Sequence, residues 1–272
     1  MQAHQRDRPT PTFVQTCYTA AMVLHNHLAL QGVTNLETLS FWSYSDIFEE
    51  GGVDSQPWHN GCAYIFLLNS HNLRRPPPPP TLILSTSFPH TDGIMNLNGV
   101  PKPIYRFFEM LKALPPAAVP VTAQVANPAD AVVPRAGSVS AGQVDAVVAV
   151  DDSMHPLVHV TALLNNFDLF DGPSSSNKTV QLVFAKLPAG AVAPANAMVD
   201  RIDSTHANPR AVWVAAGQPQ YCSPTEIAAE LAASQLVAEP LALTANADGS
   251  YSVTLTLEPF SVARVRFDYT AA

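Results

Sequence analysis

The sequence has few charged residues and no excess of positive charge. Charged side chains make up 13% of the 272 residues, and the formal net charge is −8. A nucleic-acid interface needs clustered lysine and arginine, so this composition argues against a nucleic-acid partner, and we expect none. Long apolar runs are missing as well. None reaches the roughly 20 residues that a bilayer-spanning helix needs, so we expect no membrane association of that kind.

Cysteine is also scarce. The chain has three cysteines, Cys17, Cys62 and Cys222, and their wide spacing forms neither a disulfide framework nor a metal-binding pattern. We therefore expect no metal and no cofactor. The first residues, MQAHQRDRPTPTF, contain no apolar segment of the kind found in signal peptides, so no signal peptide is expected in this stretch. Compartment and oligomeric state do not follow from these features.

Apolar residues are plentiful, at 47%, and they suffice for one large domain or two ordinary ones. The first organised element is a predicted helix of about 18 residues that starts at Phe13 and ends at Gly32. His25 and His27 lie off its apolar stripe, and we expect both to be solvated. The stripe consists of Phe13, Cys17, Ala21, Leu24 and Leu28.

A predicted strand leads into a run of aromatic and acidic residues. Leu36–Trp42 alternates as a strand does, and it overlaps the run LSFWSYSDIFEE (39–50). Further on, GIMNLNGVPKPIYRFFEMLKAL (93–114) reads as a turn and then an amphipathic helix, with Pro103 at the first helical position. A strand, a run of acidic residues at its carboxyl end and a helix that returns along the strand make one βα unit. In a (β/α)8 barrel, the chemistry gathers at the carboxyl ends of such strands.

These two stretches resemble the last βα unit of the family 39 glycoside hydrolases, the group of β-xylosidases and related α-L-iduronidases. The family pattern is close to SYWTFSD-FEE followed by GIPKP. A second block resembles an ID–HGNP–W–MG-P-Y pattern that follows the barrel in the β-xylosidase branch. That block consists of Ile202–Asp203, His206, Asn208–Pro209, Trp213, Gly217, Pro219 and Tyr221.

The resemblance implies a fold class of α/β plus all-β. Residues 1–116 would form the terminal βα portion of a (β/α)8 barrel, and residues 117–272 an antiparallel β-sandwich. The final barrel helix is expected from Pro103 to Leu114, where Pro115–Pro116 stop it.

The resemblance also implies a carbohydrate partner, a xyloside or a uronide. The candidate substrate-binding residues are Trp42, Asp46, Glu49, Glu50 and His59. An indole packs on the apolar face of a pyranose, and carboxylates accept hydrogen bonds from its hydroxyl groups. The alternative is that Trp42 lies in the core and the acidic residues form a solvated loop. His59, in QPWHNG, stands where the family has a fHGGFG-like segment, and simple loop packing explains it equally well.

We expect no catalytic residue in this chain. Retaining hydrolysis needs two carboxyl groups about 5–5.5 Å apart. In the family, the acid/base is the Glu of an Asn-Glu-Pro segment, which does not occur here, and the nucleophile ends the strand before the helix at Phe13, where the sequence has no glutamate. The prediction is therefore a C-terminal, inactive part of a retaining glycosidase. The alternatives are a non-catalytic carbohydrate-binding or scaffold protein, and a truncated product that folds poorly.

Residues 62–92 interrupt the family pattern, which continues if Gly61 is joined to Gly93. Five consecutive prolines, Pro76–Pro80, favour polyproline II and exclude a helix or a central strand at that point. We interpret the segment as an insert that comes from a retained intron or a faulty gene model. A proline-rich recognition loop is the other interpretation. Under both we expect a surface loop.

From Val119 onward, short β-branched runs between turn residues predict an antiparallel sandwich. A capping box of Ser223 and Glu226, with Pro224 at the first helical position, predicts one helix near 223–237. The predicted strands are Val119–Val125, Val144–Val150, Leu157–Asn165, Thr179–Phe184, Met198–Ile202, Tyr251–Leu257 and Val262–Tyr269.

Two features of this half bear on function. His206, Asn208 and Trp213 either line a groove near the barrel mouth or fix a long loop by hydrogen bonds and packing, and we favour the second interpretation. Asn177-Lys178-Thr179 is an acceptor sequon for N-glycosylation, which has meaning only in a secreted protein.

Overall fold

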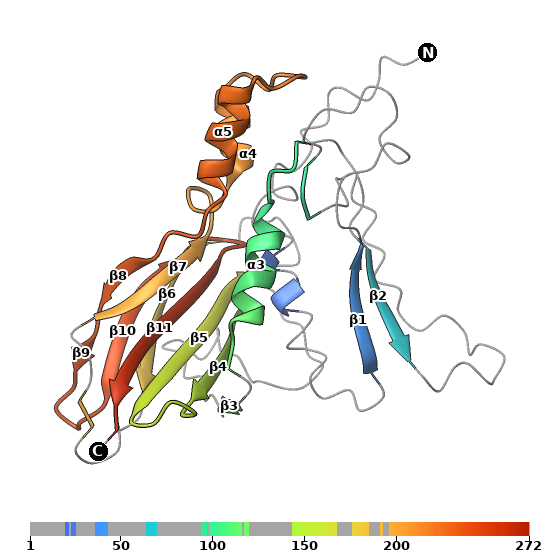
Figure 1. Cartoon of the computed structure of the whole chain (residues 1–272). Helices are drawn as coiled ribbons and strands as arrows, with labels where there is room; N and C mark the ends of the chain where they lie inside the picture. The colour runs from blue at the N-terminus through green and yellow to red at the C-terminus, as the bar shows by residue number, and fades with distance from the viewer. Residues whose placement is uncertain are drawn as a thin grey trace.

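The computed structural model describes residues 20–21, 23–25, 36–42, 64–69, 94–96, 98–115, 117–119, 143–167, 176–184, 191–192 and 196–271. For 36–42, 64–69 and 117–119 it describes the backbone alone. Most of these residues build two antiparallel sheets and a layer of helices (Figure 1).

The larger sheet has six strands in the order β3-β4-β5-β11-β7-β8. The strand β11, the last in the chain, lies at its centre, where Val265 is paired with Ala162 of β5 on one side and with Val199 of β7 on the other. The strands are β3 (Ala117–Val119), β4 (Gln143–Asp151), β5 (Leu157–Phe167), β7 (Asn196–Ile202), β8 (Glu239–Ala242) and β11 (Val262–Thr270).

The smaller sheet has three strands in the order β6-β10-β9. These are β6 (Lys178–Phe184), β9 (Thr244–Ala245) and β10 (Tyr251–Leu257). Alternation along β10 turns Val253, Leu255 and Leu257 inward and leaves Thr254 and Thr256 exposed. The inward side chains meet Ala162, Leu164, Val199, Ala263 and Val265 of the larger sheet in one apolar core. The two sheets therefore pack face to face.

The helix α3 (Pro103–Lys112) covers the other face of the larger sheet. The apolar spacing of the sequence explains its orientation, because Ile104, Phe107 and Met110 recur on one side and all three are buried. Full burial of an aromatic such as Phe107 contributes about 1.5–3 kcal/mol. Helical residues 20–21 and 23–24 join the same core, and Ala21 and Leu24 of the predicted stripe are fully buried there. The predicted helix at Pro103 is confirmed.

The helices α4 (Pro209–Ala215) and α5 (Pro224–Ala233) extend beyond the end of the sheets (Figure 1). The predicted capping box is present in α5: Glu226 N–H donates to Ser223 Oγ at 3.3 Å, and Ser223 N–H donates to Glu226 Oε2 at 2.6 Å. The helix ends at Ala233, short of the predicted residue 237. The helix α4 was not predicted as a separate element.

The strand β1 (Leu36–Trp42) has the predicted bounds, but its partner is unexpected. It pairs antiparallel with β2 (Tyr64–Asn69), which lies inside the segment interpreted as a loop. The loop interpretation is wrong for these six residues: YIFLLN is rich in aromatic and branched residues that favour a strand. Neighbouring strands of a (β/α)8 barrel run parallel, so this pair is not a barrel pair.

Candidate functional site

Among the predicted sugar-binding residues, the structure describes only Trp42, and only its backbone, at the end of β1. Asp46, Glu49, Glu50 and His59 lie outside the described residues, as does His27. Their roles stay predictions.

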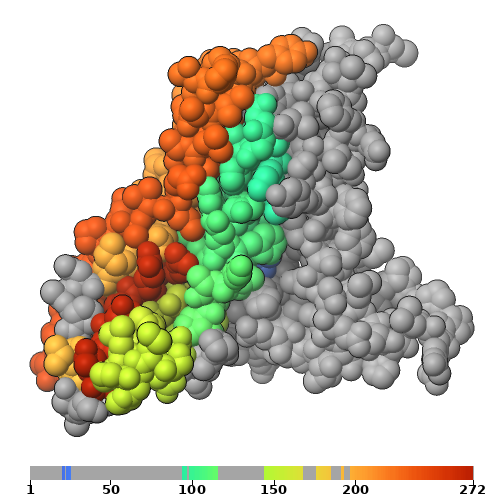
Figure 2. Space-filling model, in the orientation of Figure 1, coloured from blue at the N-terminus to red at the C-terminus, as the bar shows by residue number. Residues whose placement is uncertain are grey.

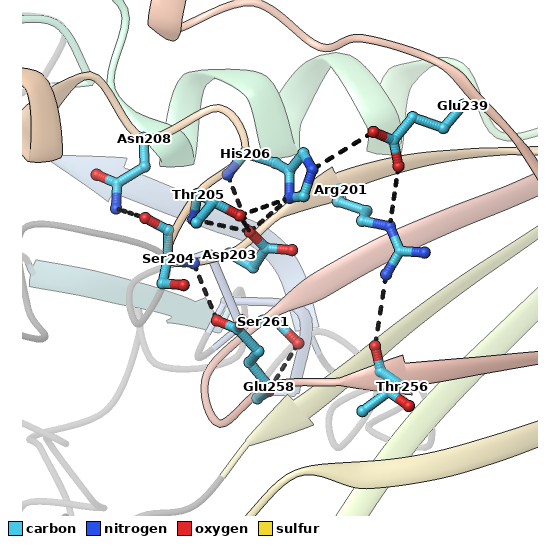
Figure 3. Close-up of polar contacts among 10 residues, drawn as sticks. All are labelled: Arg201, Asp203, Ser204, Thr205, His206, Asn208, Glu239, Thr256, Glu258 and Ser261. Atoms are coloured by element: carbon cyan, nitrogen blue, oxygen red, sulfur yellow. Dashed lines mark hydrogen bonds and ion pairs between the residues drawn. The ribbon is translucent and has the colours of Figure 1, made fainter.

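A polar cluster follows β7, at the start of the second block that carries the family resemblance (Figure 3). Asp203 is its centre. Its Oδ1 accepts hydrogen bonds from the N–H groups of Thr205 and His206, both at 2.9 Å, and from the Thr205 hydroxyl at 3.1 Å. His206 Nδ1 lies 2.7 Å from the same oxygen. A carboxylate that accepts so many bonds fixes the turn 203–206.

His206 stands between two carboxylates. Its Nδ1 faces Asp203, and its Nε2 lies 3.5 Å from Glu239 Oε1, at the start of β8. The other oxygen of Glu239 is 3.6 Å from Nε of Arg201, whose Nη1 donates to the Thr256 carbonyl of β10 at 3.5 Å. The chain of contacts therefore runs from the turn after β7, through β8, to the smaller sheet (Figure 3).

Further hydrogen bonds hold this turn and the segments next to it. Glu258 Oε2 accepts a bond from the Ser204 N–H at 3.2 Å, and the Glu258 carbonyl accepts one from the Ser261 hydroxyl at 2.7 Å. The Asn208 side chain donates to the Ser204 carbonyl at 3.1 Å. Trp213 is buried, and its indole N–H donates to the Pro219 carbonyl at 3.0 Å. His206, Asn208 and Trp213 thus fix a loop, and the favoured interpretation is confirmed.

The hydrogen bonds of this cluster join segments of the protein to one another, which indicates a structural role. Asp203 is buried, and its acceptor oxygen is occupied by the turn it closes. A general acid or base must reach a substrate atom directly or through one water. Asp203 Oδ1 instead accepts its hydrogen bonds from Thr205 and His206 of the same turn. Within the ranges that the structure describes, no group of three or more His, Cys, Asp or Glu side chains has a metal-binding arrangement.

A second polar cluster joins the first family block to α5. Asn96 Oδ1 accepts bonds from the N–H groups of Asn98 and Val100, both at 2.9 Å, and so closes a turn in which Gly99 has a positive φ of 75°. The Asn96 amide donates to Glu230 Oε2 of α5 at 3.3 Å. Glu230 is 1% exposed. Figure 2 shows the chain around α3 (green) lying against this helical region (orange).

The thiol of Cys222 belongs to the same cluster, where it donates to Glu230 Oε1 at 3.4 Å. Burial raises the pKa of this thiol to about 11, and the hydrogen bond to Glu230, its charge and that of Glu226 act in the same direction. The thiol is therefore protonated at neutral pH, which argues against a nucleophilic role. Val100 and Trp213 pack together close by, so the two family blocks meet in one apolar contact.

Arg106 of α3 is a third link to this region. Its Nε donates to the Ser234 carbonyl at 2.6 Å and its Nη2 to the Ser234 hydroxyl at 3.2 Å, just past the end of α5. Nη1 donates to Glu109 at 2.7 Å. Helical spacing places Arg106 next to the apolar face of α3, but nothing local in the sequence indicates a partner 128 residues away.

The expectation of a solvated His25 is wrong. The side chain is 4% exposed, its Nδ1 lies 2.7 Å from Asp145 Oδ2, and its ring packs against Phe167 with 5.0 Å between centroids and a tilt of 30°. Asn165 of β5 also donates to the Ala21 carbonyl at 2.8 Å, which fixes the helical residues to the sheet. The acidic partner is 120 residues away, so the sequence near His25 carries no sign of it.

No helix in the described ranges combines the length and the apolar character that a membrane crossing requires.

Solved glycoside hydrolases share the fold of this chain. A family 39 enzyme from Xanthomonas axonopodis pv. citri superimposes with a TM-score of 0.56 at 18% identity, over 96% of this chain and 42% of the other. A family 39 β-xylosidase from Caulobacter crescentus gives 0.52 at 15% identity, over 96% of this chain and 41% of the other.

The family model described as glycosyl hydrolases family 39 matches residues 6–250, and the chain belongs to this family. A relative, the β-xylosidase of Caldicellulosiruptor saccharolyticus, is 23% identical over 226 residues. The match covers 83% of this chain but 35% of that relative, so the chain spans about a third of the relative's length.

Proposed function

We propose that this chain is the C-terminal part of a retaining glycosidase of the β-xylosidase and α-L-iduronidase type, with a xyloside or uronide as its carbohydrate partner. The family match over residues 6–250 carries the proposal. The β-xylosidase name of the relative from Caldicellulosiruptor saccharolyticus favours a xyloside. In this proposal residues 1–116 are the final unit of a (β/α)8 barrel, residues 62–92 are an insert, and residues 117–272 are a β-sandwich.

Contact between the two family blocks supports this division of the chain. The turn at Asn96, which in the proposal precedes the last barrel helix, is tied to Glu230 and packs through Val100 on Trp213. A barrel and a sandwich that share a buried polar and apolar junction hold a fixed relative position. The sandwich then braces the end of the barrel where substrate binds.

The proposed sugar contacts are Trp42, Asp46, Glu49, Glu50 and His59. Trp42 ends β1, and the acidic residues follow within eight positions. An aromatic ring for the apolar face of a sugar, next to oxygen acceptors for its hydroxyl groups, is a usual composition for a small polar ligand site.

The chain contributes sugar contacts and no catalytic carboxylates. No Asn-Glu-Pro segment occurs in the sequence, and adjacent acids such as Glu49 and Glu50 cannot flank a glycosidic bond from both sides. The second candidate function is a non-catalytic carbohydrate-binding or scaffold protein. The apolar cores that the described residues form on both faces of the larger sheet favour it, because they need no catalytic residue for stability.

The test is an assay of the purified chain on aryl β-xylosides and aryl α-L-iduronides, with calorimetric titration of xylo-oligosaccharides and uronides in parallel. The proposal predicts binding of one sugar class without turnover. Turnover of either substrate would contradict the absence of the catalytic pair. Absence of heat with both sugar classes would contradict the sugar contacts and also the binding-protein alternative.

A further inference from the structure

The sequence contains one Asn-X-Ser/Thr sequon, Asn177-Lys178-Thr179, at the start of β6. Asn177 and Thr179 are both exposed, so the acceptor amide and the hydroxyl group that the sequon requires face solvent in the folded chain. The backbone beside them is held in place. Asn166 donates to the Ser176 carbonyl at 3.0 Å and to the Leu257 carbonyl at 3.2 Å.

The strand β6 is the outer strand of the smaller sheet, where it pairs with β10. It is seven residues long, and after Lys178 its sequence TVQLVF has no charge, proline or glycine. Val183 is 58% exposed on its outer face. Within the part of the chain that the structure describes, no strand pairs with its other side. A strand of this length and composition at the edge of a sheet is a template for pairing with a second chain.

The other outer strands of the two packed sheets, β3, β8 and β9, are all shorter than β6. In the described residues, β9 has two residues and β3 has three. The strand β8 has four and includes Glu239 and Pro240. Short length, charge and proline are the usual protections of a sheet edge. Of these protections β6 has one charge, Lys178 at its first residue, and Asn177 of the sequon directly precedes it.

We infer that Asn177 is an N-glycosylation site whose glycan shields the edge of β6 from self-association. The donor is an oligosaccharide carried on a lipid diphosphate. The side-chain amide nitrogen of Asn177 forms a bond to C1 of the first sugar, the bond from C1 to the diphosphate breaks, and the amide loses one proton. The bulky, hydrated glycan then occupies the space through which a second strand would approach.

The site is tested by secreting the full chain from a eukaryotic host behind a cleavable leader. We expect one mobility step that an N-glycan amidase removes, with conversion of Asn177 to aspartate seen by mass spectrometry. Thr179→Val, which keeps a β-branched residue, abolishes the step, and Thr179→Ser retains it. An unglycosylated wild type, or a glycosylated Thr179→Val chain, overturns the site.

The shielding role is tested by light scattering of glycosylated and enzymatically deglycosylated protein at equal concentration. The glycosylated form is expected to stay monodisperse, and the deglycosylated form to associate. Gln181→Lys, a charge on the exposed face of β6, should restore monodispersity without the glycan. Equal scattering from both forms, or no effect of the lysine, overturns the shielding. None of these readouts depends on glycosidase activity, so the outcome is separate from that of the proposed function.

Discussion

The side-chain amide of Asn96 donates to Glu230 Oε2 at 3.3 Å, across 134 residues of sequence. One end of this bond lies in the first family block and the other on α5, which follows the second block. The two stretches of sequence that carry the family resemblance are therefore close in space as well. The first prediction is that this contact stabilises the fold.

Replacing Asn96 by alanine should lower the free energy of unfolding by about 2–3 kcal/mol, because two backbone N–H groups and buried Glu230 each lose a partner. Urea unfolding of the bacterially expressed chain measures it. Asn177→Ala is the matched control, since Asn177 is exposed. Equal effects of the two substitutions would show that the Asn96 turn contributes nothing specific.

Asp203→Ala should lower the free energy of unfolding by about 2–4 kcal/mol, because it removes a buried carboxylate that accepts the hydrogen bonds of the turn 203–206. Asp248 is the comparison. It accepts bonds from the Ser250 N–H at 2.9 Å and hydroxyl at 2.7 Å, but at an exposed turn. Asp248→Ala should have a much smaller effect, and a result in the opposite order would refute the role given to Asp203.

The contact between His25 Nδ1 and Asp145 Oδ2 offers a third test. His25→Ala removes a buried ring and leaves the Asp145 carboxylate unpaired, so we expect a loss of about 2–4 kcal/mol. His159→Ala is the control, because His159 forms the same kind of pair with Asp268 at 2.6 Å on the surface, where such pairs contribute about 0–1 kcal/mol. Thermal and urea unfolding should both show the difference.

The Cys222 thiol should react with alkylating reagents only at a higher pH than an ordinary cysteine does. With Cys17 and Cys62 replaced by serine, Cys222 is the one remaining thiol. Because burial and Glu230 raise its pKa from 9.0 to about 11, the neutral thiol is the favoured form in the folded chain. The contribution of this thiol to the free energy of unfolding is fully present below pH 9 and is lost as pH rises toward 11.

Alkylation by iodoacetamide followed by mass spectrometry measures this pKa. Near pH 8 the thiolate fraction should be about 100-fold lower in the folded chain than in the unfolded chain, from a two-unit difference in pKa. Glu230→Gln removes the charge and should shift the reactivity profile to lower pH. An alkylation midpoint near pH 9 in the folded wild type would contradict the burial of this thiol.

Local pattern predicts much of this fold. β-branched alternation gives the strands β4, β5, β6, β7, β10 and β11 within one or two residues, and the capping box gives the start of α5. These signals depend on neighbours in sequence. The strands β8 and β9 are not predicted, because four and two residues carry too little periodicity. The pairing of β1 with β2 was missed because the five prolines led to an interpretation of the whole segment as a loop.

The polar junctions could be predicted only in part. Asp203 and His206 are three residues apart and fall in a recognised block, so their role in a loop was available from the sequence. The partners of His25, Arg106 and Asn96 lie 120, 128 and 134 residues away. No local pattern encodes such a distance, and burial of a polar side chain follows from its partner rather than from its own spacing.

The central claim is that a family 39 chain without its catalytic carboxylates still contacts sugar through Trp42. Titration with xylo-oligosaccharides while tryptophan fluorescence is followed tests it most directly. Trp58 is replaced by phenylalanine throughout, so that Trp42→Phe is compared with a chain that keeps Trp42, and buried Trp213 is a constant background in both. The account predicts a saturable change in the chain that keeps Trp42, which Trp42→Phe abolishes. A flat titration of the chain that keeps Trp42, or an equal response from the Trp42→Phe variant, would contradict it.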